Sequence, residues 1–443
     1  MTKSKTGRME AKQDSSQAAL LEVKSWLRKM ETLSVPKQRT MQESQLKLLF
    51  NHACNCSAWW RNRLTLAGYP QQAGSLFTVL AQLPPLMRSD LQEHVDEVRA
   101  WHPDWTAKEI FTSTTSGSTG LPVRVEKFSA AFNLLYGAVS LIDHEWHGRD
   151  ARLPLLIFSA DADSVRPDWG SLFAPFQGGG CVTNRFTSNC STEEEAALVL
   201  EHQPAYLKAT AFRAAAIGEV FLRQGKIVPL RQIISQYERV TPRQREVCRK
   251  AFGAEIIDRY SCEECGWLAL QCPAHEHLHV MAGTTIIEIV DEALNPCPPG
   301  VAGRVLVTSL QSYAMPIIRY DIGDIAEWGE ECDCGIRLPV IKRLWGRRRN
   351  LVRLPDGEMR PMVFHGDDVA KIPEIREFRL VQQKNSDIDF FVRATRPLSV
   401  EEVEALRTLV LKIDSQLVVT VREVAAIDWG AGLKREEFVR LES

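Results

Sequence analysis

The chain has 443 residues, of which 44% are hydrophobic and 25% are charged, and its formal net charge is -2. This is the composition of a globular protein long enough for two or three domains. The near-neutral charge argues against a nucleic-acid or membrane-surface binder, because both need a strong excess of basic residues. No apolar run approaches the ~18 residues of a membrane-spanning helix, so we expect neither nucleic acid nor membrane as a partner.

Eleven cysteines are scattered along the chain, and the polar N-terminal segment lacks the apolar core of a signal peptide. An odd number of cysteines in a chain of this size does not favour a disulfide framework. We therefore expect reduced thiols and a cytoplasmic location. The sequence does not indicate an oligomeric state.

The N-terminal part of the chain predicts helices. Residues 1–17 are polar and are expected to be disordered. Ala18–Leu33 has apolar residues at helical spacing, and a second amphipathic helix is expected within Gln45–Arg61. In that second helix, the paired Trp59 and Trp60 are more typical of core anchors than of a substrate-binding site.

A loop rich in hydroxyl groups follows at Thr112–Pro122. Gly117 and Gly120 bracket Ser118 and Thr119, so the backbone can turn tightly and direct amides and hydroxyls at one anion. The loop lacks the Gly-Lys-Ser/Thr ending of a P-loop NTPase. Taken alone, it is more typical of a flexible linker.

Strands and helices alternate in the next part of the chain. Short apolar runs at Arg152–Phe158 and Leu230–Ile234 predict buried strands. Helices are expected at Glu193–His202, at Lys208–Gln224, and from Thr241–Pro242 to a C-cap at Gly253. This alternation indicates an α/β fold.

The periodicity changes to two from Thr284, which predicts antiparallel strands at Thr285–Val290 and Gly303–Leu310. Beyond Gly346 the pattern predicts a small α+β domain. Its expected elements are strands at Phe378–Leu380, Asp387–Val392 and Gln416–Val421, and a helix that a capping box opens at Ser399 and that runs to about Ile413. We therefore expect one domain at 18–345 and a second at 346–443.

Three further motifs follow the hydroxyl loop: Tyr260–Glu264, Tyr320–Asp324 and Gly346–Arg347. With the loop, they resemble in type and order the acyl-adenylate-forming superfamily, which includes acyl- and aryl-CoA ligases, luciferases and the adenylation domains of peptide synthetases. Met315–Tyr320 and Cys332–Gly335 resemble the phenylacetate-CoA ligases in particular. The resemblance implies an α/β fold with a large N-terminal adenylate-forming domain, containing parallel sheets and a β subdomain, and a small mobile α+β C-terminal domain.

The activity that this resemblance implies is ATP-dependent activation of a carboxylic acid as acyl-AMP, with release of pyrophosphate. The acyl group then passes to a thiol, CoA being the first candidate. Aromatic acids are among the candidate substrates, and the acid pocket is expected among residues between Phe132 and Gly266. Transfer to a carrier protein or an amine stays open, as does a degenerate zinc-stabilised binding protein.

The resemblance also implies roles for individual residues. Glu264 would bind Mg²⁺, which takes carboxylate and phosphate oxygens together, and would so assist catalysis. Tyr260 would pack against the adenine, Asp324 would accept hydrogen bonds from the ribose, and Arg347 is the nucleotide candidate of a basic cluster. The β- and γ-phosphates of ATP would be held by the loop residues Ser116, Gly117, Ser118, Thr119 and Gly120.

Lys434 lies where the family carries its adenylation lysine. In that role its ammonium would bridge the substrate carboxylate and the α-phosphate when the small domain closes. A lysine near a chain end is often only a solvated charge, and Arg435 is the nearest alternative.

The sequence departs from the family pattern at two places. Glu263 stands where a threonine or serine is usual, which adds a negative charge close to ATP, and Ser261 replaces a glycine. At the hinge, Arg348–Asn350 replaces the usual acidic pair.

Sulfur and imidazole groups are concentrated in two short segments, Cys262–His279 and Cys332–Cys334. Such a density matches a tetrahedral zinc site. Resemblance to the phenylacetate-CoA ligases selects Cys272, His279, Cys332 and Cys334 as the ligands. With no open ligand position this zinc would be structural, although Cys262 or Cys265 could replace one ligand and unliganded buried thiols are the alternative.

Overall fold

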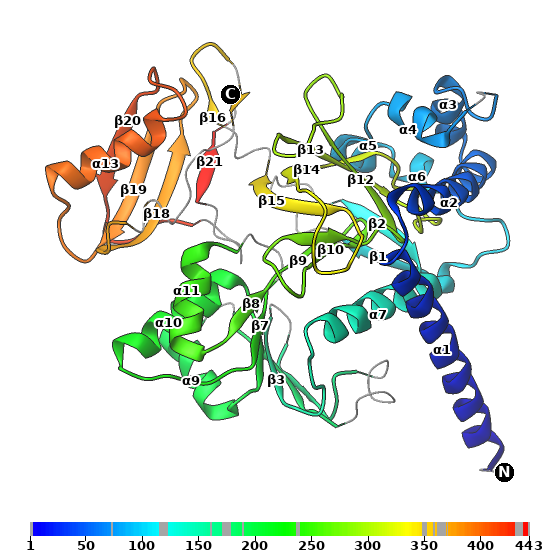
Figure 1. Ribbon diagram of the computed structural model, residues 1–443, viewed down its shortest axis with the longest axis horizontal. Helices are drawn as coiled ribbons and strands as arrows, with labels where there is room; N and C mark the ends of the chain where they lie inside the picture. The colour runs from blue at the N-terminus through cyan, green and yellow to red at the C-terminus, as the bar shows by residue number, and fades with distance from the viewer. Residues whose placement is uncertain are drawn as a thin grey trace. The chain divides into compact units, whose positions relative to one another are not determined.

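The computed structural model describes most of the chain, and its elements are labelled in Figure 1. The described residues are 3–71, 74–114, 123–159, 162–170, 179–187, 190–235, 240–347, 352–357, 359–360, 369, 371–429 and 437–441, without the side chains of 3–16 and 359–360. The chain divides into two compact units. The first unit takes Met1–Ala151, Gly170–Gly178 and Asp258–Leu344, and the second takes Arg152–Trp169, Gly179–Ile257 and Trp345–Ser443. The expected boundary between residues 345 and 346 stays a prediction.

The first unit opens with three helices. Helix α1 (Lys3–Met30) extends further toward the N-terminus than its apolar pattern indicates, into the segment expected to be disordered. The helix expected within Gln45–Arg61 is two helices, α2 (Val35–Cys56) and α3 (Ala58–Leu66), because the backbone is extended at Ser57 and its hydroxyl caps α3. Trp60 is fully buried and Trp59 packs on the same core, which confirms both as core anchors.

Short helices lead from this bundle into a hairpin and a long helix. They are α4 (Leu76–Gln82), α5 (Arg88–Glu93), α6 (Val95–Val98) and a 3₁₀ helix at Ala107–Glu109. Strands β1 (Ile110–Thr114) and β2 (Arg124–Phe128) then pair antiparallel, so the first residues of the expected hydroxyl loop, Thr112–Thr114, belong to β1. Helix α7 (Ser129–Trp146) follows directly and packs on α1 and β10.

A seven-stranded sheet forms the centre of the first unit, in the order β12-β13-β14-β15-β11-β10-β9. Its strands are β9 (Arg259–Cys262), β10 (Gly266–Gln271), β11 (Leu278–Val280), β12 (Thr285–Val290), β13 (Ala302–Ser309), β14 (Tyr320–Trp328) and β15 (Val340–Arg347). The pairs β12–β13 and β13–β14 are antiparallel, as the period of two predicts.

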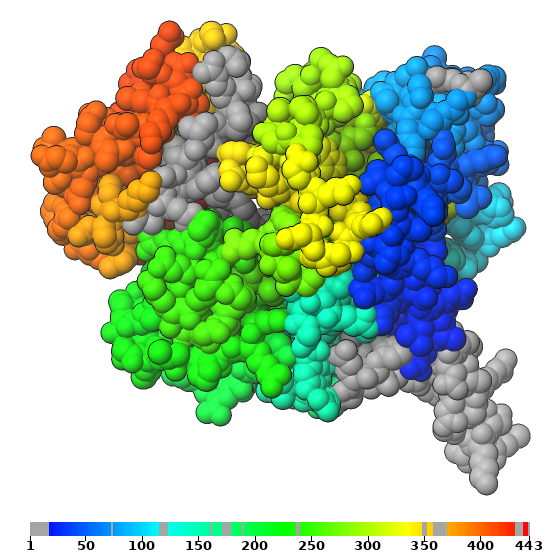
Figure 2. All heavy atoms as spheres, viewed as in Figure 1, coloured from blue at the N-terminus to red at the C-terminus, as the bar shows by residue number. Residues whose placement is uncertain are grey.

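The N-terminal helices cover part of this unit. Figure 2 shows residues of α1 and α2 (blue) against the segment before β15 (yellow). Gln38 Nε2 donates to the carbonyl of Arg337 at 3.0 Å, and the amide of Arg337 donates to the carbonyl of Glu31 at 2.7 Å. These contacts hold the turn that carries Cys332 and Cys334 against the helices.

The second unit contains the parallel sheet. Its order is β4-β5-β3-β6-β7-β8, with parallel pairing from β5 to β8 and an antiparallel edge strand β4. The strands are β3 (Leu155–Ser159), β4 (Ser164–Arg166), β5 (Val182–Phe186), β6 (Tyr206–Lys208), β7 (Gln232–Ile234) and β8 (Glu255–Ile257). The predicted α/β pattern is confirmed.

The helices described between these strands are α9 (Thr192–His202), α10 (Ala211–Arg223) and α11 (Pro242–Phe252). Helix α11 has the predicted ends, because Thr241 caps its N-terminus and Gly253 takes the left-handed conformation at φ +62°. Helix α10 begins later than expected. Lys208 belongs to β6 instead, and Thr210 is the N-cap.

In the C-terminal part of the second unit, the described residues form a four-stranded sheet with a helix packed beside it. The sheet order is β20-β19-β18-β21, and β21 pairs parallel with β18. The elements are β16 (Val352–Arg353), β17 (Met359–Arg360), β18 (Ile375–Gln382), β19 (Ile388–Ala394), α13 (Val400–Leu411), β20 (Val419–Glu423) and β21 (Phe438–Arg440). The predicted capping box at Ser399 is present.

Two expectations concern the whole chain. All eleven cysteines carry free thiols in this structure. Among the described residues, no helix combines the length and the apolar character that crossing a bilayer requires.

Candidate active site

Two of the predicted motifs meet in the seven-stranded sheet of the first unit. Tyr260 lies on β9 and Glu264 in the turn after it, while Tyr320 and Asp324 lie on β14. The hydroxyl of Tyr260 donates to Asp324 Oδ2 at 2.7 Å, and the hydroxyl of Tyr320 donates to Glu264 Oε1 at 2.9 Å. The fold thus brings together two tyrosine–carboxylate pairs, and each motif supplies the tyrosine of one pair and the carboxylate of the other. The members of the two pairs lie 64 and 56 positions apart in the sequence.

The carboxylate of Glu264 is held as an acceptor. Its side chain is buried, and Arg88 Nη1 lies 3.8 Å from the oxygen that Tyr320 contacts. Burial and the neighbouring carboxylate raise the pKa of Tyr320, so its hydroxyl keeps its proton and donates. A carboxylate oriented in this way suits a divalent cation.

The pair of Tyr260 and Asp324 is equally enclosed. Asp324 is 9% exposed and Tyr260 is 7% exposed. The hydrogen bond between them fixes the phenol ring and directs the carboxylate, so ring and acceptor are fixed together. Such a pair offers a flat face and an anionic acceptor to a nucleoside.

The unusual Glu263 has a cationic neighbour that sequence reasoning did not place at the site. Lys127 Nζ, from β2, donates to the backbone carbonyl of Glu263 at 2.5 Å and lies 4.0 Å from its carboxylate. The extra negative charge beside Glu264 is therefore partly neutralised. The signal available in the sequence was a basic residue shortly after the hydroxyl loop.

A cavity of about 40 Å³ opens beside Lys127. Strand β2, helix α7, strand β10 and the residues around β13 form its walls, which include Lys127, Phe132, Tyr136, Trp267, Ser309 and Gln311. The acid pocket was expected among residues between Phe132 and Gly266, and both of these residues line this cavity. Sequence reasoning missed Lys127 and the wall around Ser309, because the folding of the sheet and not the spacing of residues brings these segments to one place.

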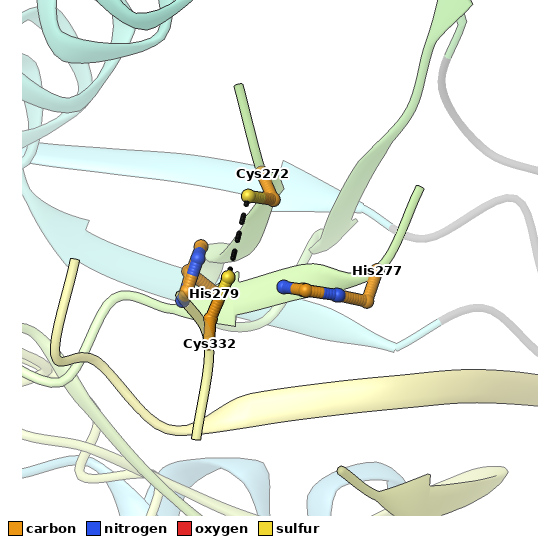
Figure 3. Close-up of side chains that lie close together, drawn as sticks. All are labelled: Cys272, His277, His279 and Cys332. Carbon is orange, nitrogen blue, oxygen red and sulfur yellow. Dashed lines mark hydrogen bonds between the residues drawn. The ribbon is translucent and has the colours of Figure 1, made fainter. Parts of the chain in front are cut away.

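A second cluster gathers sulfur and imidazole at one end of the sheet. Figure 3 shows Cys272, His277, His279 and Cys332 directed toward one point, and their ligand atoms all lie within 4.8 Å of one another. The sulfurs of Cys272 and Cys332 are 3.8 Å apart. Cys334, which the resemblance selects in place of His277, lies with its sulfur 3.3 Å from His279 Nε2.

The cluster is arranged for metal ligation. The sulfurs of Cys272, Cys332 and Cys334 each accept a backbone N–H at 3.4 Å. Burial raises the pKa of Cys272 to about 12 and also raises the pKa of Cys332, so a bound cation would be needed to hold these two thiols as thiolates at neutral pH. His279 Nδ1 lies 3.2 Å from the carbonyl of Leu338, so Nε2 is the ring nitrogen that faces the sulfurs. Burial lowers the pKa of His279 to about 4, which keeps the imidazole neutral at neutral pH.

The alternative ligands Cys262 and Cys265 belong to neither group of potential metal ligands in the described part of the chain. The amide of Cys265 donates to the sulfur of Cys262 at 3.3 Å, and Cys265 lines the cavity instead.

Several predicted site residues cannot be compared with this geometry. The phosphate-loop residues Ser116–Gly120, the hinge residues Arg348–Asn350 and Lys434 lie outside the described residues. Arg347 is exposed at the end of β15 and belongs to the second unit. The roles of all these residues stay predictions.

The chain resembles known proteins over most of its length. No family model matches the chain. It is 22% identical over 369 residues to a phenylacetate-coenzyme A ligase of Thermus thermophilus, covering 81% of each chain. It is 24% identical over 385 residues to the enzyme of the same name from Pseudomonas putida, covering 81% of this chain and 82% of the relative.

Among solved structures, 2-hydroxyisobutyryl-CoA ligase in complex with an acyl-AMP aligns over 93% of this chain and 91% of its own, with a TM-score of 0.74 and 17% identity. The chain has the fold of the acyl-adenylate-forming ligases. The predicted resemblance to the phenylacetate-CoA ligases is confirmed as well. Within this adenylate-forming fold, the amide bond synthetase McbA from Marinactinospora thermotolerans is a more distant neighbour, with a TM-score of 0.51 over 74% of this chain and 69% of its own at 17% identity.

Proposed function

We propose that the protein is an AMP-forming acid–CoA ligase. A carboxylate attacks the α-phosphorus of ATP to give acyl-AMP and pyrophosphate, and the thiol of CoA then attacks the acyl carbon and releases AMP. The observation that carries the proposal is the pairing of Glu264 with Tyr320 and of Asp324 with Tyr260 in the adenylate-forming fold. Relatives of this fold have been solved with acyl-AMP and with CoA.

Each part of the reaction has a candidate residue. Glu264 holds Mg²⁺ against the phosphates, because its carboxylate is oriented by Tyr320. Asp324 accepts hydrogen bonds from the ribose, Tyr260 packs on the adenine, and Arg347 contacts the nucleotide. The hydroxyl loop Ser116–Gly120 holds the β- and γ-phosphates, and Lys434 bridges the acid and the α-phosphate.

The sulfur and imidazole cluster holds a structural zinc ion. Three ligands belong both to the set implied by the resemblance and to the cluster in the structure: Cys272, His279 and Cys332. The fourth ligand is His277 or Cys334. The zinc would supply no chemistry to the reaction, since four protein ligands leave it no open position. Thiols that bind zinc need a reducing compartment, which supports the cytoplasm as the location.

The deciding experiment is a screen of carboxylic acids for ATP-dependent pyrophosphate release, with and without CoA. We expect activity that requires a divalent ion, and an acyl-CoA product when CoA is present. Pyrophosphate release together with an amide product from an amine, and no thioester product with CoA, would favour an amide synthetase such as the neighbour McbA. Nucleotide binding without pyrophosphate from any acid would favour a degenerate binding protein.

Replacement of the metal-binding carboxylate tests the site itself. Glu264→Gln keeps the hydrogen bond from Tyr320 but removes the charge, so pyrophosphate release should fall by about 10²–10³. Glu246→Gln, on the exposed face of α11, is the matched control and should leave the rate unchanged. Undiminished turnover of Glu264→Gln, or wild-type turnover in chelator, would contradict the assignment.

A further inference from the structure

The cavity beside Glu263 has an unusual distribution of charge. Among the described residues that line it, Lys127 carries the one formal charge, and the other walls are aromatic, aliphatic, thiol, hydroxyl or amide groups. Lys127 itself is 5% exposed. The lining therefore carries one positive charge, with the carboxylates of Glu263 and Glu264 nearby but outside the lining. A cation in the wall of a cavity favours anionic ligands over neutral ones of the same shape.

The partners of this ammonium group leave room for an anion. Lys127 Nζ donates to the carbonyl of Glu263, while the Glu263 carboxylate stays at 4.0 Å and is 48% exposed at its side chain. Burial lowers the pKa of Lys127, and the carboxylate of Glu263 acts in the opposite direction. A loose ion pair of this kind leaves the charge incompletely compensated inside the protein.

Aromatic rings extend from the ammonium in a series. Lys127 Nζ lies 4.3 Å from the centre of the Phe132 ring. The ring centroids of Phe132 and Tyr136 are 5.9 Å apart, and those of Tyr136 and Trp267 are 5.2 Å apart and stacked. A ligand with an anionic head and a flat apolar body would meet a cation first and aromatic faces after it.

We propose that Lys127 is a substrate-binding residue that receives the reacting carboxylate of the acid, with the acid's apolar body directed along Phe132, Tyr136 and Trp267. This inference rests on the proposed function, and it adds a second cation to the one expected from Lys434. Lys127 contacts the residue next to Glu264, so the carboxylate would lie at the end of the cavity where the metal and the α-phosphate meet.

The size of the cavity agrees with this orientation. Its 40 Å³ corresponds to about three water-sized spheres, which is room for a carboxylate and the first atoms of the acid. Tyr136 is 42% exposed at the edge. A longer acid would extend past this ring or displace it, whereas the buried Lys127 would keep its place.

The test measures binding directly, by calorimetry, with benzoate, phenylacetate and the two corresponding amides in the absence of ATP. Wild-type protein should bind at least one carboxylate and discriminate against its amide. Lys127→Met should weaken carboxylate binding by about 30-fold or more and abolish the discrimination, while Lys127→Arg should retain most of it. Lys250→Met, an exposed lysine on α11, is the control and should bind as wild type.

Loss of the ion pair with Glu263 could by itself disturb the turn, so the double variant Lys127→Met with Glu263→Gln is measured too. It removes both charges and should bind as weakly as Lys127→Met alone. In turnover assays with an acid that the wild type uses, the acid KM should rise in Lys127→Met while the ATP KM changes less than about twofold.

The outcomes separate this inference from the proposed function. Equal affinity of the wild type for acid and amide, no binding of either carboxylate, or full binding by Lys127→Met would overturn the role of Lys127. Selective carboxylate binding without pyrophosphate release from any acid would instead support the role and reject the ligase.

Discussion

At the scale of single residues, the buried carboxylate of Asp143 organises a charge cluster in the first unit. Arg149 and Arg259 both contact Asp143 Oδ2, and His147 Nε2 lies 3.6 Å from its other oxygen. Burial, with Arg149 and Arg259 acting in the same direction, lowers the pKa of His144 to about 3. Burial also lowers the pKa of His147 to about 4, although Asp143 opposes it.

These two histidines predict a loss of stability in mild acid. Their folded pKa values lie below the unfolded value of about 6.5, so the unfolded chain takes up protons first as pH falls. Each histidine should lower the free energy of unfolding by roughly 1.4 kcal/mol per pH unit as the pH falls from about 6.5 to its folded pKa. Asp143, whose pKa is lowered, does not contribute until pH falls below about 4.

Urea unfolding at pH 7 and pH 5 checks this prediction. The fall in unfolding free energy should be smaller in a His144→Gln, His147→Gln variant than in the wild type, whatever its stability at pH 7. An equal fall in both proteins would show that other groups cause the acid sensitivity.

The site shows which residues a sequence can single out. Glu264 and Asp324 could be singled out because each stands in a short motif with its own order of residue types, and their roles stay predictions. Lys127 could not, because its contact with Glu263 depends on where β2 lies relative to the turn after β9. The choice between His277 and Cys334 likewise depends on the bend of a turn, which spacing does not specify.

At the scale of elements, the sulfur and imidazole cluster joins the end of β10, the start of β11 and the turn before β15. A zinc ion here would cross-link segments far apart in the sequence, so binding energy would become folding energy. We expect about one zinc per chain, and a lower thermal midpoint after chelation.

Single variants decide which donors bind this zinc. Cys332→Ser should lose most of the metal, as measured by elemental analysis, and Cys181→Ser, an exposed thiol in the second unit, should keep it. His277→Gln and Cys334→Ser are then compared. The variant that loses zinc identifies the fourth ligand, and full zinc content in Cys332→Ser would exclude the site as described.

The helices whose predicted ends agree best with the structure are those that have capping residues. Helix α11 lies between Thr241 and Gly253, as expected, and α13 starts at the capping box of Ser399. Elements without such signals differed: the helix expected across Ser57 is split, and β6 was not expected, since three residues are too few to show a period.

At the scale of the whole molecule, the order of four motifs was sufficient to predict the fold, because four motifs in one order are far less common by chance than any one of them. The sequence could not predict that residues 152–169 and 179–257 would group with the C-terminal part in one compact unit. That grouping depends on contacts between distant segments, which local patterns do not contain.

Because the proposed reaction has two half-reactions, replacing Lys434 should change their rates to different extents. If its ammonium stabilises charge only during adenylation, Lys434→Ala should reduce acyl-AMP formation from acid and ATP by about 10²–10³. Thioester formation from preformed acyl-AMP and CoA should change little. Arg435→Ala tests the nearest alternative, since a selective loss of adenylation in that variant alone would move the role to Arg435. Equal losses in the two assays of Lys434→Ala would reject the role of Lys434.

Strand β21 fixes the chain to β18 near its C-terminal end. Arg379 of β18 donates to the carbonyl of Asp428, and the amide of Leu380, also of β18, donates to the carbonyl of Glu437 at 2.7 Å. Asp428 and Glu437 are therefore both attached to one strand. Removing β21 would leave one of these two attachments and would expose the backbone of β18 along one side, which should lower the stability of the four-stranded sheet.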